Sequence, residues 1–206
     1  MTLRRIALLA CGCALFVAAI PVAQNPSWAG SIVGTKHDLS GKEWGTGEVC
    51  KFCHTPHNAK SPQDAPLWNH ASTSASYTLY SSPTMDVPVG QPGKASKTCL
   101  SCHDGTVALD SFGNNTGTHL ISGTSNLGTD LSDDHPIGIE WQHQNQPPAA
   151  CANCHGSMHV PFTRVLPFYS RRVECGSCHN PHNNDLTKFL RMTVVGSEIC
   201  LHCHNK

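Results

Sequence analysis

The sequence predicts a fold that is mostly coil with short helices and few or no strands, built around bound groups rather than a large side-chain core. Twelve cysteines and fourteen histidines occur among only 206 residues. After residue 29 the chain is poor in Leu, Ile, Val and Phe and rich in Gly, Ser, Thr, Asn and Pro. Such a composition is typical of disorder or of an externally stabilised fold. No long amphipathic period predicts a long helix.

Residues 1–29 predict an export signal that is removed from the mature chain. A basic start, an apolar run over residues 6–20 and the small-x-small sequence Ser27-Trp28-Ala29 precede Gly30. The run has about 15 residues, short of the ~20 that span a bilayer as a helix. We therefore expect a secreted domain over residues 30–206 without a transmembrane segment. It would pass through the periplasm to the extracellular space or the cell surface.

The signal contains one alternative processing site. Leu8-Leu9-Ala10-Cys11 resembles a lipoprotein cleavage box, which would leave Cys11 acylated at the new terminus. The apolar run before Cys11 is short, and hydrophobic residues continue beyond it. The sequence therefore favours cleavage at Ala29.

The ten cysteines after the signal form five pairs, each with two intervening residues and each followed at once by a histidine. Positions i, i+3 and i+4 share one face of a helical turn, so two sulfurs can bond the haem vinyls while the histidine reaches the iron. The sequence therefore predicts five haem c groups. The attachment cysteines are Cys50, Cys53, Cys99, Cys102, Cys151, Cys154, Cys175, Cys178, Cys200 and Cys203, and the proximal histidines are His54, His103, His155, His179 and His204.

A zinc knuckle or a redox-active dithiol is the alternative interpretation of any single pair. Neither requires a histidine directly after the second cysteine, and here that histidine occurs five times. Free dithiols would also tend to oxidise after export. The repeat therefore favours haem.

The distal ligands distinguish an electron carrier from a catalytic haem. The mature chain has only three methionines, so histidine is the expected ligand. His57 and His182 lie three residues after a proximal histidine in the strings Cys-His-Thr-Pro-His-Asn and Cys-His-Asn-Pro-His-Asn. The intervening proline breaks the turn, so either histidine can cap a neighbouring iron. The alternative is a surface histidine beside a turn. His159, four residues after His155, is a further candidate.

The residues alone leave other histidines less defined. His70 follows Trp68 and fits either a ligand or a packing role. His119 and His143 lie in loop-like Gly, Asn and Gln surroundings that favour solvent exposure. His202 lies between the cysteines of its own motif and is not expected to be a ligand.

Short helical turns are expected around residues 96–103 and 197–204, and surface loops over 61–66, 81–93 and 113–134. One unit cored by stacked haems fits this pattern better than separate domains. The formal charge is zero, and haem propionates would add negative charge, which argues against nucleic-acid binding.

The chain resembles the extracellular multihaem cytochromes with doubled CxxCH motifs, in particular the OmcE-like subunits of cytochrome nanowires. The resemblance implies coil-rich subunits that hold bis-histidine haems in a continuous chain. The matching strings are residues 30–33, 37–40, 49–58, 66–70, 99–108, 127–138, 175–182 and 200–204.

The resemblance implies His37, His135 and His182 as distal ligands and His57 as the ligand to a haem in the next copy of the chain. The motif at 151–155 departs from the family's four-haem pattern. Its distal ligand stays open among His159, His143, His70 and His119.

These expectations describe an electron conduit rather than an enzyme, passing electrons to other redox proteins or extracellular acceptors. One alternative is a multihaem reductase of nitrogen or sulfur oxyanions, which needs an open iron and nearby acid-base groups. Another is a soluble periplasmic electron shuttle, which differs in assembly rather than in chemistry.

Overall fold

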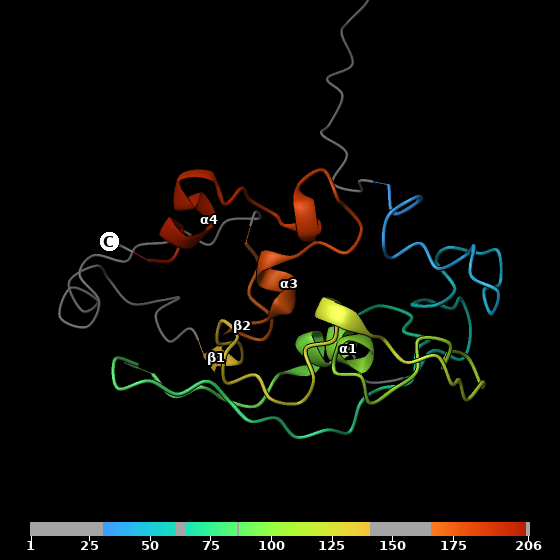
Figure 1. The fold of residues 1–206 in the computed structure, drawn as a ribbon, viewed down its shortest axis with the longest axis horizontal. Coiled ribbons are helices and arrows are strands. Elements are labelled where there is room, and N and C mark those ends of the chain that lie inside the picture. The colour runs from blue at the N-terminus through green and yellow to red at the C-terminus, as the bar shows by residue number, and fades with distance from the viewer. Residues whose placement is uncertain (1–30, 61–64, 86, 141–165, 205–206) are drawn as a thin grey trace, which may run out of the picture.

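The structure, a computed structural model, describes residues 31–60, 65–85, 87–140 and 166–204. Within these ranges the expected coil-rich fold is confirmed (Figure 1). The predicted signal at 1–29 lies outside them. The elements are the helices α1 (Lys94–His103), α3 (Cys175–Cys178) and α4 (Glu198–Leu201), the 3-10 turns η1 (Gly123–Ser125), η2 (Thr187–Phe189) and η3 (Val195–Ser197), and the strands β1 (Ile139–Glu140) and β2 (Arg172–Val173).

Helix α1 lies against α3 near the centre of the molecule (Figure 1). The helical turn expected from residue 96 begins at Lys94, because the good helix formers Lys94 and Ala95 extend it toward Gly93. The turn expected over 197–204 is helical in α4 only to Leu201. It then closes by a bond from the Cys203 N–H to the Cys200 carbonyl at 3.1 Å. Both expected helices thus occur: α1 contains a whole attachment motif, and α4 contains the first cysteine of another.

A two-stranded antiparallel sheet connects the middle of the chain to its C-terminal third. Ile139 pairs with Val173, and the Gly138 N–H donates to the Val173 carbonyl at 2.8 Å. Gly138 has a φ of 74°, and a Cβ at this position would overlap the Gly90 carbonyl oxygen. Only glycine fits this close approach of two backbones. The sheet thereby fixes the segment that leads into α3.

The side-chain core is small. Tyr77, Leu100 and Leu131 form one buried cluster. A second group places the rings of Trp44 and Phe52 at 6.0 Å and those of Phe52 and Phe112 at 4.8 Å, as aromatic edge contacts. These groups are modest for a chain of this length, as the composition predicts.

Buried polar side chains organise the coil around this core. Asp104, directly after α1, accepts hydrogen bonds from the hydroxyls of Tyr77 and Thr73, both at 2.6 Å, and from the Thr106 N–H at 2.8 Å. Burial favours the neutral acid, but these bonds together keep the pKa of Asp104 below its ordinary value. Satisfied polar groups of this kind allow irregular backbone to be buried.

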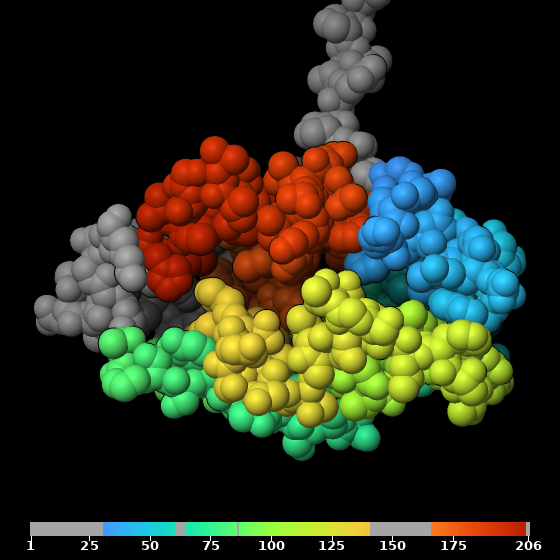
Figure 2. Space-filling model, viewed as in Figure 1, coloured from blue at the N-terminus to red at the C-terminus, as the bar shows by residue number. Residues whose placement is uncertain are grey.

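The coil segments cover α1 and α3 from several sides. In Figure 2 the C-terminal residues (orange to red) lie across the hollowed face from the coil around residues 100–140 (green to yellow). Within residues 31–60, 65–85, 87–140 and 166–204, no helix has the length and apolar character needed to cross a membrane.

Replacing Leu131 by alanine should lower the free energy of unfolding by about 2–5 kcal/mol, because a buried leucine leaves a cavity. Leu131 is 6% exposed, whereas the control residue Leu120 is 55% exposed and should tolerate the same change. Chemical denaturation of the loaded protein measures both. Equal stability of the two variants would contradict the assignment of this core.

Candidate functional site

Four attachment motifs lie in the described part of the chain, and each forms one helical turn. The histidine N–H donates to the carbonyl of the first cysteine at 2.8 Å for His54 and His204 and at 3.0 Å for His179. His103 occupies the corresponding position at the end of α1. Both sulfurs and the imidazole therefore share one face of the turn, as the spacing predicts. The motif at 151–155 lies outside the described residues.

Backbone carbonyls hold three proximal rings by Nδ1. The acceptors are the carbonyl of Pro66 for His54 at 2.7 Å, of Ser125 for His103 at 2.8 Å and of Lys188 for His179 at 2.8 Å. An Nδ1–H that donates in this way fixes the tautomer and leaves the Nε2 lone pair for a metal. The segments that follow these three motifs thus hold the imidazoles with Nε2 free, as an iron ligand requires.

Three proximal histidines each face a second histidine from a distant segment. The ring centroids are 6.1 Å apart for His37 and His103, 6.0 Å for His54 and His182, and 6.3 Å for His135 and His204. An imidazole–metal bond is about 2 Å long, so two imidazoles on opposite sides of one iron have centroids about 6 Å apart. The spacing fits bis-histidine ligation of haem iron. These second histidines are three of the distal ligands that the sequence nominates.

Two of these second histidines are kept in the form that binds metal. Burial, followed by the charge of His103, lowers the pKa of His37. Burial, followed by His54, lowers the pKa of His182. Both rings are therefore neutral at pH 7, as a ligating imidazole must be.

The attachment cysteines lie next to one another in a definite order. Burial, then Cys53 and Asp104, raise the pKa of Cys102 to about 12. The Asn69 N–H donates to the Cys53 carbonyl at 2.9 Å, and the Cys102 sulfur lies 3.6 Å from His70 Nε2, so the first two motifs both contact residues 69–70. The neighbouring Cys175 thiol, followed by burial, raises the pKa of Cys99. The Cys175 N–H donates to the Ser96 hydroxyl of α1 at 2.9 Å, which links the second motif to the fourth.

The last two motifs continue this order. Burial, then Cys203, raise the pKa of Cys178 to about 11. The second and the fourth motif are in contact through α1 and α3.

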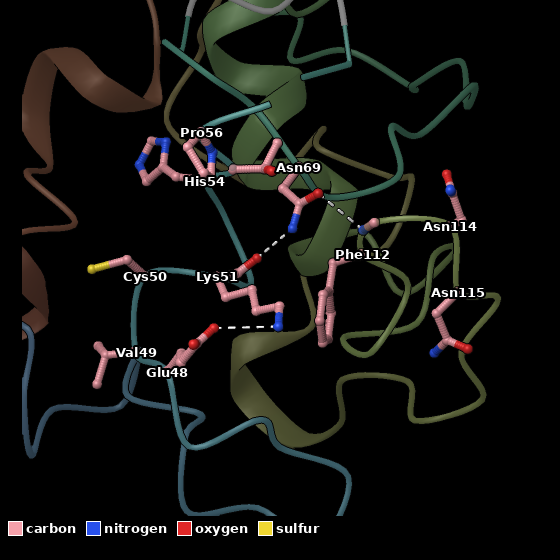
Figure 3. Close-up of a pocket in the computed structure, with 12 residues that line it drawn as sticks. Glu48, Val49, Cys50, Lys51, His54, Pro56, Asn69, Phe112, Asn114 and Asn115 are labelled. Atoms are coloured by element: carbon pink, nitrogen blue, oxygen red, sulfur yellow. Dashed lines mark hydrogen bonds and ion pairs between the residues drawn. The ribbon is translucent and has the colours of Figure 1, made fainter. Parts of the chain in front are cut away.

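An open groove of about 840 Å³ adjoins the first motif. Cys50 and His54 lie along one side of it and Phe112 along the other (Figure 3). Asn69 joins the two sides, since its amide donates to the Lys51 carbonyl at 2.5 Å and its oxygen accepts from the Gly113 N–H at 3.1 Å. The groove has the size and the aromatic wall that a porphyrin edge requires.

His179 and His57 are left over from this pairing. Among the described residues, no second histidine ring lies against His179, although its Nδ1 is held like that of the other proximal rings. The His57 ring is exposed and makes no hydrogen bond within the same ranges. The sequence nominates His57 for a neighbouring iron, and its ring lies open to solvent.

The structure distinguishes His70 from His119. His70 is 1% exposed, and its two ring nitrogens lie 2.7 Å from the Ala71 carbonyl and 3.0 Å from the Ala108 carbonyl, so it packs rather than offering a free nitrogen. His119 is exposed, and its Nδ1 is held by Asp110 at 2.8 Å. Its Nε2 makes no hydrogen bond in the described part of the chain, so His119 stays a candidate ligand. The candidates His143 and His159 lie outside the described residues.

Sequence reasoning missed two residues beside the site. Phe189 stacks on His37 with ring centroids 4.3 Å apart and an interplanar angle of 15°. Glu174 is buried directly before Cys175 and reaches across to α1. Neither belongs to the repeated motif, and both act through contacts with distant segments.

A comparison with known families identifies the C-terminal part of this site. Residues 168–206 match the family described as doubled CXXCH motif, which covers the motifs at 175–179 and 200–204. No curated protein matches the chain. The match supports a multihaem c-type cytochrome, in which the cysteines of CXXCH motifs bind haem c covalently and the histidine coordinates its iron for electron transfer.

Intact-mass spectrometry counts the bound haems. We expect five, and replacing Cys175 and Cys178 by alanine should remove one, because this haem loses both thioether bonds. The same change at Cys151 and Cys154 should also remove one. If the second variant still carries as many haems as the unaltered protein, no haem is attached at Cys151 and Cys154 and the expected count falls to four.

Replacing His37 by alanine should open one iron and convert one haem from low-spin to high-spin. Electron paramagnetic resonance of the oxidised protein measures this conversion. His70→Gln is the matched control, and it should lower stability without changing any spin state. A low-spin spectrum in the His37 variant equal to that of the unaltered protein would contradict the pairing with His103.

Proposed function

We propose that the chain is a subunit of an extracellular cytochrome filament that carries electrons over long distances through five bis-histidine haem c groups. The observation that carries the proposal is the set of three histidine pairs at 6.0–6.3 Å in a molecule whose attachment motifs are neighbours. When bound, the haems supply a reversible ferric–ferrous couple. No substrate is transformed, and the protein is not an enzyme.

The chain's residues have separate roles in this function. Each cysteine pair fixes a porphyrin, and each proximal histidine binds its iron. For His54, His103 and His179, a backbone carbonyl holds Nδ1 and leaves Nε2 for the iron. His37, His135 and His182 close the opposite side of three irons. Two strong nitrogen ligands leave no open coordination position, which favours electron transfer over catalysis.

A second copy of the chain would supply the distal ligand that the described residues of one copy do not offer the His179 iron. The exposed His57 ring has no partner within the described residues, and His179 faces no second histidine there. We assign His57 of one copy as the distal ligand to the His179 iron of the next. This bond would join the haems of successive copies into one conductor.

The fifth haem, at Cys151 and Cys154 with His155, lengthens or branches this conductor. His119 is a candidate for its distal ligand, because Asp110 holds Nδ1 and leaves Nε2 open. His159 and His143 are the other candidates.

The proposed location is outside the cell, reached through the periplasm by the signal at 1–29. The proposed partners are further copies of the chain and redox proteins or extracellular acceptors at the filament's ends.

Replacing His57 by alanine should shorten or abolish the filament, because each interface loses one metal–ligand bond. Negative-stain imaging and size-exclusion chromatography of the secreted protein measure length. The matched control is Asn58→Gly at the next exposed residue, because glycine readily adopts the positive φ of 55° found there. This control should leave the filaments intact. Full-length filaments in the His57 variant would contradict the bridging bond.

The same preparation separates the alternatives. Native protein that is monomeric at all concentrations, with every haem low-spin, would identify a soluble shuttle. A monomer with one high-spin iron would favour the reductase. Such an iron would lie at His179, which faces no second histidine among the residues that the structure describes.

A further inference from the structure

Glu174 connects two attachment turns that are far apart in sequence. Its side chain is 1% exposed, and both carboxylate oxygens lie 3.1 Å from the Gly93 N–H at the start of α1. The Ser96 hydroxyl also donates to this carboxylate. In return, the Ser96 oxygen accepts the Cys175 N–H at 2.9 Å. The two turns therefore hold each other through three side-chain contacts.

The local backbone keeps Glu174 in this position. Its own N–H donates to the Ser177 hydroxyl at 3.0 Å, which starts α3 at the next residue. The carboxylate faces the N-terminus of the ten-residue helix α1, where free N–H groups favour negative charge. Bonds from N–H and O–H donors to a carboxylate are strong and directional. A buried carboxylate needs such donors to offset its loss of water.

The contact sets the distance between two haem positions. Cys99 lies three residues after Ser96 in α1, and the Cys175 N–H donates to the Ser96 oxygen at 2.9 Å, so the sulfurs of Cys99 and Cys175 belong to adjoining turns. In the loaded protein these two sulfurs belong to two different haems. Any shift of α3 along α1 therefore moves one haem relative to the other.

We propose that Glu174 is a positioning residue that holds the Cys175–His179 haem against the Cys99–His103 haem and lowers the reduction potentials of this pair. The inference rests on haem attachment at these two turns, which belongs to the proposed function. The carboxylate and Ser96 fix the approach of the haems. An ionised Glu174 would stabilise the oxidised irons, because charge and burial around a haem set its potential.

Glu174→Gln tests the charge while keeping the shape of the side chain. Glu198→Gln is the matched control, because Glu198 lies two residues before Cys200 but is exposed. In a spectroelectrochemical titration, we expect Glu174→Gln to raise two of the potentials. The expected change is about tenfold in the reduction equilibrium, which corresponds to about 59 mV for one electron. Glu198→Gln should raise none by a comparable amount.

Ser96→Ala tests the positioning and keeps the charge. We expect the exciton couplet in the Soret circular dichroism to change, because the orientation of two neighbouring haems changes, while the potentials shift less than in Glu174→Gln. If Glu174→Gln does not yield loaded protein, Ser96→Ala decides alone. An unchanged couplet in Ser96→Ala overturns the proposal. Fully loaded Glu174→Gln with the potentials of the control also overturns it.

Peptide mass spectrometry of the unaltered protein distinguishes failure of this inference from failure of the proposed function. A missing haem at Cys99 or Cys175 would remove the basis of both. Haem at both sites with a filament defect only in the His57 variant would support the function, whatever the Glu174 result.

Discussion

The five-residue turn that joins two cysteines to a histidine is the constraint on which the rest of the structure depends. It places two sulfurs and an imidazole on one face of the chain, so each turn is complete before any tertiary contact forms. What the remaining chain must supply is the environment on the open side: a carbonyl for Nδ1, an aromatic wall and a second imidazole. Coil suffices for this, because the carbonyls and rings come from segments without a common period.

The fold class and the attachment turns could be predicted because their causes are local. Spacing in the motif fixes the turn, and the scarcity of large apolar residues predicts a small core, which Tyr77, Leu100 and Leu131 form. The resemblance to a known family nominated the histidines that face three proximal rings. The motif alone gave no reason for His37 to meet His103, since this contact joins two segments that share no local pattern.

The roles of two other residues could not be predicted from the sequence, because they too depend on contacts between distant segments. From the sequence, His70 fitted iron ligation as well as packing. In the structure its ring nitrogens lie against the Ala71 and Ala108 carbonyls. Glu174 resembled any acidic residue before a motif, and its role depends on Ser96, which lies 78 residues earlier. Long-range polar contacts depend on the whole path of the chain, and neither composition nor period records that path.

The pairing of His54 with His182 has a consequence for the order in which the protein matures. If the proposed signal at 1–29 directs export, the chain leaves the cell from its N-terminus, and the first attachment turn emerges well before the segment that contains its proposed distal ligand. Under this ligation the first iron stays open until the C-terminal third has been exported and folded, whereas His37 is already outside when His103 arrives. The first attachment site to emerge would then be among the last to gain its second iron ligand. Ligation of that iron would occur only after the chain as far as His182 has been exported.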